Sequence, residues 1–425
     1  MKSNLENKIV CVVGLGYVGL PLAEALAAQM KVIGFDIDAR KIADIKKRYS
    51  RGKDKSLKSN FTLTTDPEEI RQADIVIICV PTPVTPSKEP DLTPVIKASE
   101  TIGRNLKRGS TVILESTVFP GTTEEIVGPI LEKESGLRCG RDFKIAHSPE
   151  RINPGDEAHT LGKVTKVVAG MDKATTRLLT DLYSSVARDV FIARDIRTAE
   201  AAKVIENIQR DLNIALMNEL ALIFDRMGLN TRDVLDAAAT KWNFHRYSPG
   251  LVGGHCIPVD PYYLVYKARE YDYHSQVILS GRAINDSMPR YVAQMTIKAL
   301  NNVGKVIKGS KVLIMGLTYK ENVRDTRESP VKAIIKELNE YGVDVCGFDP
   351  LLDSIETEFA IKVAKSLGKS PTYDAVIITV AHDAFRTFKL SELKAAMKAR
   401  PVLVDIRQIF TLKEAEKEGF YYKTL

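Results

Sequence analysis

A glycine-rich turn near the start of the chain constrains its fold more than any other feature. Residues 14–19 (GLGYVG) fit the pattern G-x-G-x-x-G, follow the apolar run IVCVV and open a helix-like stretch. The first glycine permits a tight turn, the second lets the backbone approach a pyrophosphate, and the third allows close helix packing. Asp36 closes the next strand-like run, 22 residues after Gly14. That is the distance expected of a carboxylate that binds a ribose 2′-hydroxyl, so we expect a Rossmann-type dinucleotide-binding unit.

The acid at the end of the second run favours NAD as the cofactor, because a carboxylate there repels the 2′-phosphate of NADP. Arg40 and Lys41 follow it closely and weaken this discrimination. The alternative is a glycine turn with only a structural role. The motif predicts cofactor contacts at Gly14, Gly16, Tyr17, Val18, Gly19 and Asp36.

Strand-like and helix-like segments alternate in two separate parts of the chain. The first part extends to about residue 170, and the second starts near Ser310 with the run KVLIMG. Between them, residues 197–227 contain no proline or glycine and repeat apolar residues at helical spacing until Gly228. We therefore expect an α/β protein with two Rossmann-like, doubly wound domains joined by a helical central domain with one long helix. The expected boundaries are 1–196, 197–305 and 306–425.

Composition excludes several classes of protein. The chain has 425 residues, of which 44% are hydrophobic and 27% charged, and no apolar run approaches the roughly 18 residues that cross a bilayer. The N-terminal apolar run is too short for a signal peptide, so we expect a cytoplasmic protein without a membrane partner. Five cysteines do not suggest a disulfide framework, and six histidines show no metal-ligand spacing. The net charge of +7 is dispersed, which favours two anionic ligands over nucleic acid.

Cys256 differs from the other cysteines because it lies in the segment GGHCIPVDP. Gly253 and Gly254 permit unusual backbone angles or the close approach of a ligand. A thiol in a cationic setting ionises and attacks carbonyls, and Asp260, four residues later, is placed to contact water or substrate. The alternative is a buried structural thiol.

Two further groups of polar residues are candidates for anion binding. Lys203 and Asn207 are four residues apart on the long predicted helix, so they share a face and could stabilise an oxyanion. The alternative is an ordinary solvated helix face. Lys320 and Arg327 flank the strand-to-helix turn of the second α/β part, where the alternative is unspecific surface charge.

The order of these motifs resembles the UDP-glucose/GDP-mannose dehydrogenase family from Lys8 to about Ile409. The resemblance rests on GLGYVGLP, VPTP, ESTVFPGTTEE, SPERINPG, AEAAKVIENIQRDLNIALMNE, GLVGGHCIPVDPYYL and GLTYKENVRDTRES. SPERINPG, KVIENIQRDLNIAL, KWNF and PGLVGGHCIPVDPYYL are most similar to the branch acting on UDP-N-acetylhexosamines, particularly the Vi-antigen-type UDP-N-acetylglucosamine 6-dehydrogenases. The resemblance implies a homodimer that uses NAD to oxidise the C6 alcohol of a UDP-sugar to a carboxylate for surface polysaccharide synthesis.

The resemblance also implies roles for individual residues. Cys256 is expected to be the nucleophile, which forms a thiohemiacetal and then a thioester. Lys203 and Asn207 are expected to stabilise the oxygen at C6, and Asp260 to assist base chemistry through water. Thr117 and Glu150 are expected at the active site. Further contacts are implied to the cofactor from Thr82, Thr117 and Arg327, and to the substrate from Glu150, Arg151, Lys203, Asn207, Arg246, Gly253 and Lys320.

Two departures from the pattern of UDP-glucose enzymes bear on the substrate. Pro154 occupies the position at which the pattern of UDP-glucose enzymes has a second glutamate. Val259 occupies a position at which those enzymes tend to carry lysine. Both changes make the site less charged, which suits an N-acetyl sugar. UDP-GlcNAc is the first expectation, ahead of UDP-GalNAc, UDP-ManNAc and UDP-glucose.

Two other functions share part of this pattern. A two-electron hydroxyacid dehydrogenase of the 6-phosphogluconate type has a similar N-terminal domain and a helical middle, but it lacks the cysteine and the third domain. A non-catalytic regulator would bind NAD without turning over any UDP-sugar. Two NADH formed per substrate would separate the expected enzyme from both.

Overall fold

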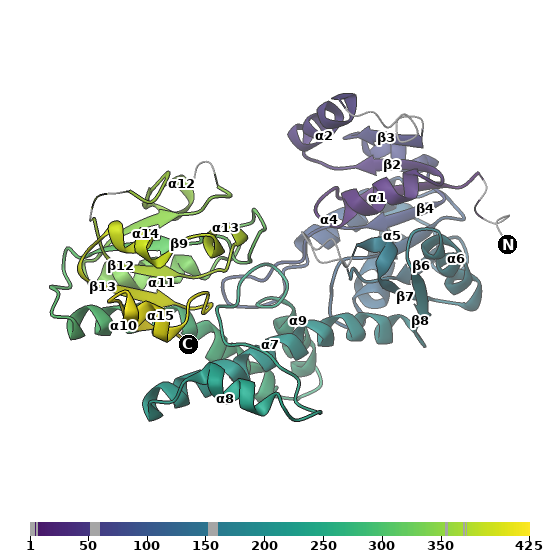
Figure 1. Ribbon diagram of the computed structural model, residues 1–425. Coiled ribbons are helices and arrows are strands. Elements are labelled where there is room, and N and C mark those ends of the chain that lie inside the picture. The colour runs from purple at the N-terminus through teal and green to yellow at the C-terminus, as the bar shows by residue number, and fades with distance from the viewer. Residues whose placement is uncertain are drawn as a thin grey trace. The chain divides into compact units, whose positions relative to one another are not determined.

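The protein folds into two compact units in the computed structural model. The structure describes residues 5, 7–51, 60–151, 160–352, 356–368, 370 and 372–425. The first unit comprises residues 1–207 and 259–274, and the second comprises residues 208–258 and 275–425 (Figure 1). The expected helical middle, 197–305, is therefore shared between the units.

The first unit is built on an eight-stranded sheet. Its strand order is β3-β2-β1-β4-β5-β6-β7-β8, the doubly wound arrangement expected from the alternation in the sequence. All pairs are parallel except β6 and β7, which run antiparallel. The strands are β1 (Ile9–Val13), β2 (Lys31–Phe35), β3 (Phe61–Thr64), β4 (Ile75–Ile78), β5 (Thr111–Leu114), β6 (Lys144–His147), β7 (Thr165–Gly170) and β8 (Asp189–Ile192).

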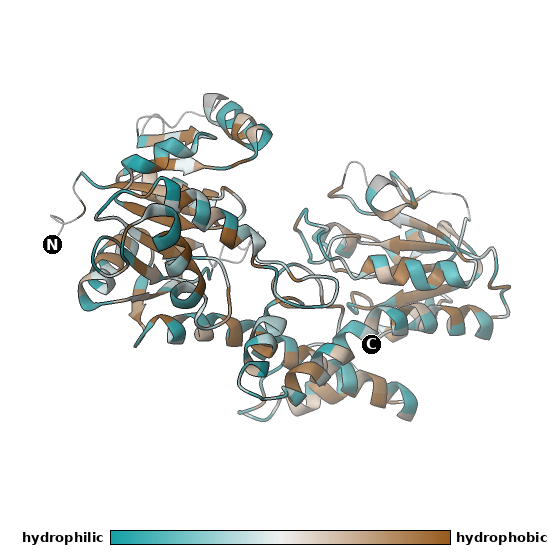
Figure 2. Cartoon of the chain, turned by 180° about the vertical axis from the view of Figure 1, so that it is seen from behind, coloured by the Kyte–Doolittle hydropathy of each residue, from teal (hydrophilic) through white to brown (hydrophobic). Residues whose placement is uncertain are grey.

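Helices cover this sheet and enclose two apolar cores. The central strands β1, β4 and β5 are buried along most or all of their length, and their side chains are divided between the two cores, as a parallel sheet covered on both faces requires. Figure 2 shows these strands as apolar stretches between helices with polar faces. The helices are α1 (Gly19–Ala27), α2 (Ala39–Arg51), α4 (Thr93–Arg104), α5 (Gly128–Ser135) and α6 (Lys173–Ser184).

The second unit repeats this strand order in a six-stranded, fully parallel sheet. The order is β11-β10-β9-β12-β13-β14. Its strands are β9 (Lys311–Met315), β10 (Asp344–Phe348), β11 (Lys362–Val363), β12 (Tyr373–Ile378), β13 (Met397–Asp405) and β14 (Tyr421–Lys423). Its helices are α11 (Val331–Glu340), α12 (Glu356–Phe359), α13 (Asp383–Arg386), α14 (Leu390–Ala395) and α15 (Leu412–Lys417).

The remaining helices carry Lys203, Asn207 and Asp260, three of the polar residues that the sequence singles out. The long helix α7 (Ile196–Met227) starts in the first unit and continues into the second. It is followed by α8 (Thr231–Ala238), α9 (Asp260–Arg269) and α10 (Gln276–Asn302). Glu200 fixes the start of α7, because its buried carboxylate accepts hydrogen bonds from the backbone amides of Gly121 and Thr123 at 2.5 and 2.9 Å. None of the helices in the described ranges has the length and apolar character needed to cross a bilayer.

Local differences from the sequence-based expectations have simple causes. The edge strands β3, β8, β11 and β14 were not predicted, because they are short and contain at most one buried residue each. Helix α11 begins at Val331, directly after Ser329 and Pro330. The Ser329 hydroxyl donates to the carbonyl of Leu317 at 2.8 Å and thereby ties the helix start to the turn after β9.

Candidate active site

The glycines of the N-terminal turn differ in their surroundings as the motif predicts. Gly14 has φ +94°, and a Cβ there would lie 2.7 Å from the carbonyl oxygen of Cys79. A Cβ on Gly19 would lie 1.9 Å from the carbonyl oxygen of Gly14, so the start of α1 packs directly on the turn. A Cβ on Gly16 would meet no heavy atom within 4 Å. The space beside Gly16 fits a cofactor pyrophosphate, which binds where the backbone of a helix N-terminus is accessible.

Asp36 lies next to this turn at the end of β2. Its carboxylate accepts hydrogen bonds from the amide of Leu15 at 2.9 Å, the amide of Asp38 at 3.0 Å and the ammonium of Lys41 at 2.8 Å. Burial favours the neutral acid, but these hydrogen bonds outweigh burial and hold the pKa of Asp36 below its ordinary value. The ion pair with Lys41 also reduces the positive charge available to a 2′-phosphate. Tyr17 is exposed and Val18 half-buried at the start of α1.

Asn207 and Asp260 form a buried polar pair in the first unit. The Asn207 amide donates to the Asp260 carboxylate at 2.5 Å, and both side chains are buried. Burial raises the pKa of Asp260 to about 6, although the positive charge of Lys203 and the hydrogen bond from Asn207 both lower it. Lys203 itself is half-buried on α7, one turn before Asn207. The structure thus brings together three residues that the sequence places on two separate segments.

Two loops lie side by side at the ends of β5 and β6. Glu150, the SPE glutamate, is 7% exposed, and its backbone amide donates to the carbonyl of Glu115 at 3.4 Å. Thr117 follows on the first loop and is half-buried. Arg151, expected to contact substrate, forms an ion pair with Glu206 of α7 at 2.6 Å and donates to the carbonyl of Thr165 at 3.0 Å. Pro154 lies outside the described residues.

Val259 belongs to a small apolar cluster with Phe119 and Tyr263. Val259 is 6% exposed, so this position is apolar in its surroundings as well as in its side chain. The Tyr263 hydroxyl donates to the carbonyl of Pro83 at 3.0 Å and therefore anchors the loop that contains the half-buried Thr82.

The loop with Cys256 belongs to the second unit and packs on the turn after β9. A Cβ on Gly253 would lie 2.6 Å from Pro330, and one on Gly254 would lie 2.6 Å from the ring of Tyr319. Gly254 also has φ +85°, so the predicted unusual backbone angle is present. The close approach that these glycines permit is made by the chain's own Tyr319 and Pro330. Cys256 is half-buried, and its approach to Lys203 and Asn207 stays a prediction.

A buried amide holds the other end of this loop. The side chain of Asn218 on α7 donates to the carbonyl of Gly250 at 3.0 Å and accepts from its amide at 2.8 Å. Asn285 of α10 accepts a further hydrogen bond from Asn218 at 2.8 Å and donates to Asp211. The loop is thereby fixed to two helices on its N-terminal side and to Tyr319 near the cysteine.

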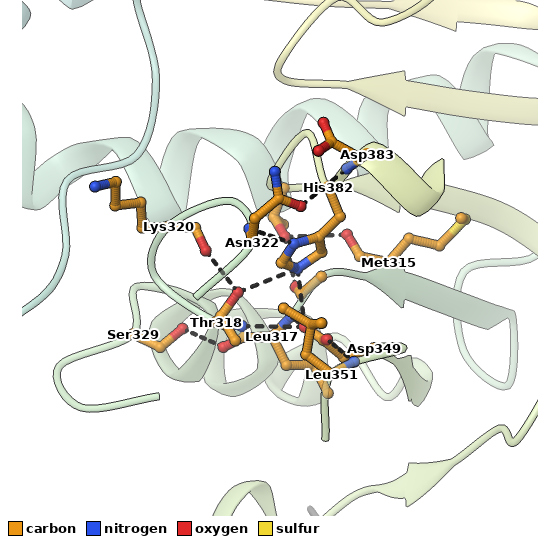
Figure 3. Close-up of polar contacts among 12 residues, drawn as sticks. Met315, Leu317, Thr318, Lys320, Asn322, Ser329, Asp349, Leu351, His382 and Asp383 are labelled. Atoms are coloured by element: carbon orange, nitrogen blue, oxygen red, sulfur yellow. Dashed lines mark hydrogen bonds and ion pairs between the residues drawn. The ribbon is translucent and has the colours of Figure 1, made fainter. Parts of the chain in front are cut away.

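The turn after β9 is stabilised by a buried histidine (Figure 3). His382 accepts from the amide of Asn322 through Nδ1 at 2.9 Å, so its proton lies on Nε2, which faces Asp349 at 3.3 Å and Thr318 at 3.2 Å. The Thr318 hydroxyl donates to the carbonyl of Lys320 at 2.9 Å. In Figure 3 the Lys320 side chain extends away from this network.

Two further arginines that were expected to bind ligands form contacts within the chain itself. The Arg327 guanidinium donates to Asp325 at 2.6 Å and lies 3.3 Å from Nδ1 of His255. Arg246 forms an ion pair with Asp236 of α8 and is exposed. Their contacts to NAD and substrate stay predictions.

Comparison with known proteins identifies the family. The family models for the NAD binding, central and UDP binding domains of the UDP-glucose/GDP-mannose dehydrogenase family match residues 8–187, 197–287 and 313–412. The chain belongs to this family. It is therefore an oxidoreductase that uses NAD and acts on a nucleotide sugar, as the resemblance implied.

Individual relatives match over almost their whole length. "Protein CapL" of Staphylococcus aureus is 46% identical over 96% of this chain and 97% of its own. A UDP-N-acetyl-D-glucosamine 6-dehydrogenase of Pseudomonas aeruginosa is 45% identical over 95% of this chain and 98% of its own. Among solved structures, a UDP-D-ManNAc dehydrogenase of Pyrococcus horikoshii superposes with a TM-score of 0.86 at 31% identity, covering 98% of each chain.

Some residues that shape the site of this family member were missed in the sequence. Lys166 is fully buried on β7, and its ammonium contacts the buried Glu115 carboxylate. The available signal was a lysine within the apolar run KVTKVVAG, where a charge requires a partner. His382 and Asp349 were missed because their positions, after β12 and at the end of β10, are far apart in sequence.

Proposed function

We propose that this protein oxidises the C6 hydroxyl of a UDP-N-acetylhexosamine to a carboxylate in two NAD-dependent steps. The observation that carries the proposal is the buried group of Asn207 and Asp260 beside the charge of Lys203. Such a group can bind a hydroxyl oxygen, stabilise the negative charge that develops on it and accept a proton. UDP-GlcNAc is the proposed sugar, because a relative named for it is 45% identical while the UDP-D-ManNAc dehydrogenase structure is 31% identical.

The cofactor site fits NAD, because Gly16 is open and Asp36 is an anion at the turn. Bound there, NAD would supply the hydride acceptor for C6 of the sugar. Gly14, Gly16 and Gly19 would hold its pyrophosphate and Asp36 its ribose, with further contacts from Tyr17, Val18, Thr82, Thr117 and Arg327. Lys320, Arg151, Arg246 and the backbone of Gly253 would contact the UDP-sugar.

The chain's own residues then divide the work of a four-electron oxidation. Lys203 and Asn207 stabilise the alkoxide as the hydroxyl proton leaves, and Asp260 takes up protons through water. The Cys256 thiol adds to the aldehyde carbon to give a thiohemiacetal, whose oxidation gives a thioester. Water attacks the thioester, releases the carboxylate and returns the thiol, while Thr117 and Glu150 hold the reacting groups. The covalent bond to sulfur retains the aldehyde between the two oxidations.

We propose that the enzyme works as a cytoplasmic homodimer that supplies a uronate for a surface polysaccharide. On α7, Leu216, Ile223 and Met227 share one helix face, and each is at least 41% exposed. A two-fold contact between copies would cover this face. The five free cysteines suit a reducing compartment. The central segment 197–305 would then act as the dimerisation domain between domains 1–196 and 306–425.

A substrate panel tests the proposed function. Purified enzyme is incubated with NAD and UDP-GlcNAc, UDP-GalNAc, UDP-ManNAc or UDP-glucose, and NADH is followed by absorbance. We expect two NADH per sugar and the highest kcat/KM with UDP-GlcNAc. Equal or better activity with UDP-glucose contradicts the N-acetylhexosamine assignment. One NADH per substrate supports a two-electron dehydrogenase, and NAD binding without turnover supports a regulator. Sedimentation as a monomer at micromolar protein contradicts the dimer.

A further inference from the structure

Three fully buried polar side chains form a cluster inside the first unit. Glu115 follows β5, Lys166 lies on β7 and Tyr183 on α6, and each has 0% exposure. The Lys166 ammonium contacts one oxygen of Glu115, and the Tyr183 hydroxyl donates to the other at 2.8 Å. The same ammonium lies 5.2 Å from the centre of the Tyr183 ring, within the range of a cation–π contact.

Such a cluster is poorly explained by stability alone. Removing two charges from water costs about as much as their attraction returns, and apolar replacements of buried ion pairs are often neutral or stabilising. Burial also raises the pKa of Glu115 to about 7, despite the opposing charge of Lys166. The fold therefore retains a carboxylate whose ionised form is disfavoured by burial. A function in placing other groups would account for its presence.

The hydrogen bonds of Lys166 identify the groups that it places. Its ammonium donates to the carbonyl of Pro149 at 2.8 Å and to the carbonyl of Ser148 at 3.4 Å. These two residues directly precede Glu150. Ser148 is held further by its amide, which donates to Leu114 at 3.1 Å, and by its hydroxyl, which donates to Val167 at 2.8 Å.

Glu115, the ion-pair partner of Lys166, lies at the base of the second loop of the site. Glu115 is followed two residues later by Thr117, and its own carbonyl accepts from the amide of Glu150 at 3.4 Å. One buried cation is therefore bonded to both loops, to a side chain at the base of one and to the backbone of the other. Moving Lys166 would shift Glu150 and Thr117 relative to each other.

We propose that Lys166, held by Glu115 and Tyr183, is a positioning residue that fixes the loops 115–117 and 148–150 in the arrangement needed for catalysis. The proposal rests on the proposed function, in which Thr117 and Glu150 act at C6 of the sugar. It predicts that loss of Lys166 impairs turnover through geometry while most of the NAD affinity is retained, because the glycine turn and Asp36 do not depend on these contacts and Thr117 is the one expected NAD contact on the two loops.

Paired variants separate positioning from stability. Lys166→Met removes the cation and its bonds to the backbone. The triple variant Glu115→Met/Lys166→Met/Tyr183→Phe removes the whole polar cluster and replaces it with side chains of similar size. We expect kcat to fall roughly 10–100-fold in both, since small displacements of catalytic groups have effects of that size. The dissociation constant of NAD should rise by less than kcat falls, since Thr117 is only one of the expected NAD contacts, and the triple variant should regain thermal stability without regaining kcat.

A matched control is Lys305→Met, which breaks the ion pair with Asp374 at 3.0 Å in the second unit. It should lower the Tm and leave kcat unchanged at temperatures where the protein is folded. A triple variant with both stability and kcat of the wild type overturns the proposal. So does a Lys166→Met variant whose kcat matches that of Lys305→Met. If Lys166→Met does not fold, the triple variant decides alone.

Amide hydrogen exchange makes the outcome independent of the proposed function. We expect faster exchange in peptides covering 115–117 and 148–151 of the triple variant than in the wild type. Unchanged exchange there overturns the positioning proposal even if the enzyme is active. A wild type that is inactive on every UDP-sugar contradicts the proposed function, while faster exchange would still support the placing of the two loops by Lys166.

Discussion

The two α/β sheets of this protein share a strand order but differ in the turn that follows their first strand. The strand order β3-β2-β1-β4-β5-β6 of the first sheet recurs as β11-β10-β9-β12-β13-β14 in the second. Gly14 and Gly316 both follow the first strand with φ +94°. Each second strand is followed by an aspartate, Asp36 or Asp349. Its carboxylate accepts a hydrogen bond from the backbone amide of the residue after the glycine, Leu15 at 2.9 Å or Leu317 at 2.7 Å.

The two turns differ in the segment between the glycine and the next helix. In the first sheet, α1 begins at Gly19 and the space beside Gly16 is open. In the second, α11 begins only at Val331, and the intervening loop places Tyr319 against Gly254 of the Cys256 loop. The same strand order thus offers a cofactor site in one half and a support for the Cys256 loop in the other. Repetition of a fold does not imply repetition of a site.

The largest expected effect separates chemistry in one half from cofactor binding in the other. Cys256→Ser should lower uronate formation by about 10³-fold or more, because a serine hydroxyl stays protonated near neutral pH and is a poor nucleophile. NAD affinity should be unchanged, since the glycine turn is in the other half. Mass spectrometry after incubation with NAD and UDP-sugar would detect a slow ester adduct. Near-normal yields of uronate and NADH would remove Cys256 from the mechanism.

Two buried aspartates with similar pKa values give the next test. Burial raises the pKa of Asp260 in the first unit and of Asp405 in the second to about 6. Asp260 acts as a base only when ionised, so kcat should fall about tenfold per pH unit below 6. Asp260→Asn should abolish this fall of kcat at acidic pH and lower kcat about 10²-fold. Asp405→Asn is the matched control. A change in the acidic pH dependence of kcat in this variant would contradict the assignment of that dependence to Asp260.

Alanine at one glycine of each half should give opposite phenotypes. Gly16→Ala meets no protein atom, so the Tm should hold while the dissociation constant of NAD rises roughly tenfold or more. Gly254→Ala forces a side chain at φ +85° against Tyr319 and should cost about 1–3 kcal/mol of unfolding free energy with NAD binding retained. Calorimetry and NAD titration measure both. Loss of stability in Gly16→Ala would mean that the turn is structural.

The smallest effects are expected from the two equivalent carboxylates. Asp36→Asn should weaken NAD binding about tenfold and reduce the preference for NAD over NADP. Asp349→Asn should leave NAD binding intact and destabilise the protein by about 2 kcal/mol, because the buried carboxylate accepts from Leu317, Leu351 and His382. Loss of NAD affinity in both variants would contradict the assignment of NAD binding to the first half alone.

Local sequence patterns were sufficient to predict most of the fold. The glycine turn, the alternation of apolar runs and the absence of proline and glycine from α7 are each visible in short stretches of sequence, so they predicted the inner strands of both sheets, the long helix and an NAD site. The edge strands β3, β8, β11 and β14 were missed, since short strands with at most one buried residue leave no clear pattern. Individual motifs also marked the separate parts of the candidate site.

The contacts that join those parts were decided by tertiary structure. The sequence by itself determined two Rossmann-like halves, an anionic residue at the first turn and a cysteine between glycines. Only the folded chain shows Asn207 bonded to Asp260, Lys166 bonded to the loops of Glu115 and Glu150, and Tyr319 as the neighbour of Gly254. The physical reason is that these contacts depend on burial and on partners distant in sequence. A charge such as Lys166 is acceptable inside a strand only because residues far along the chain supply its acceptors.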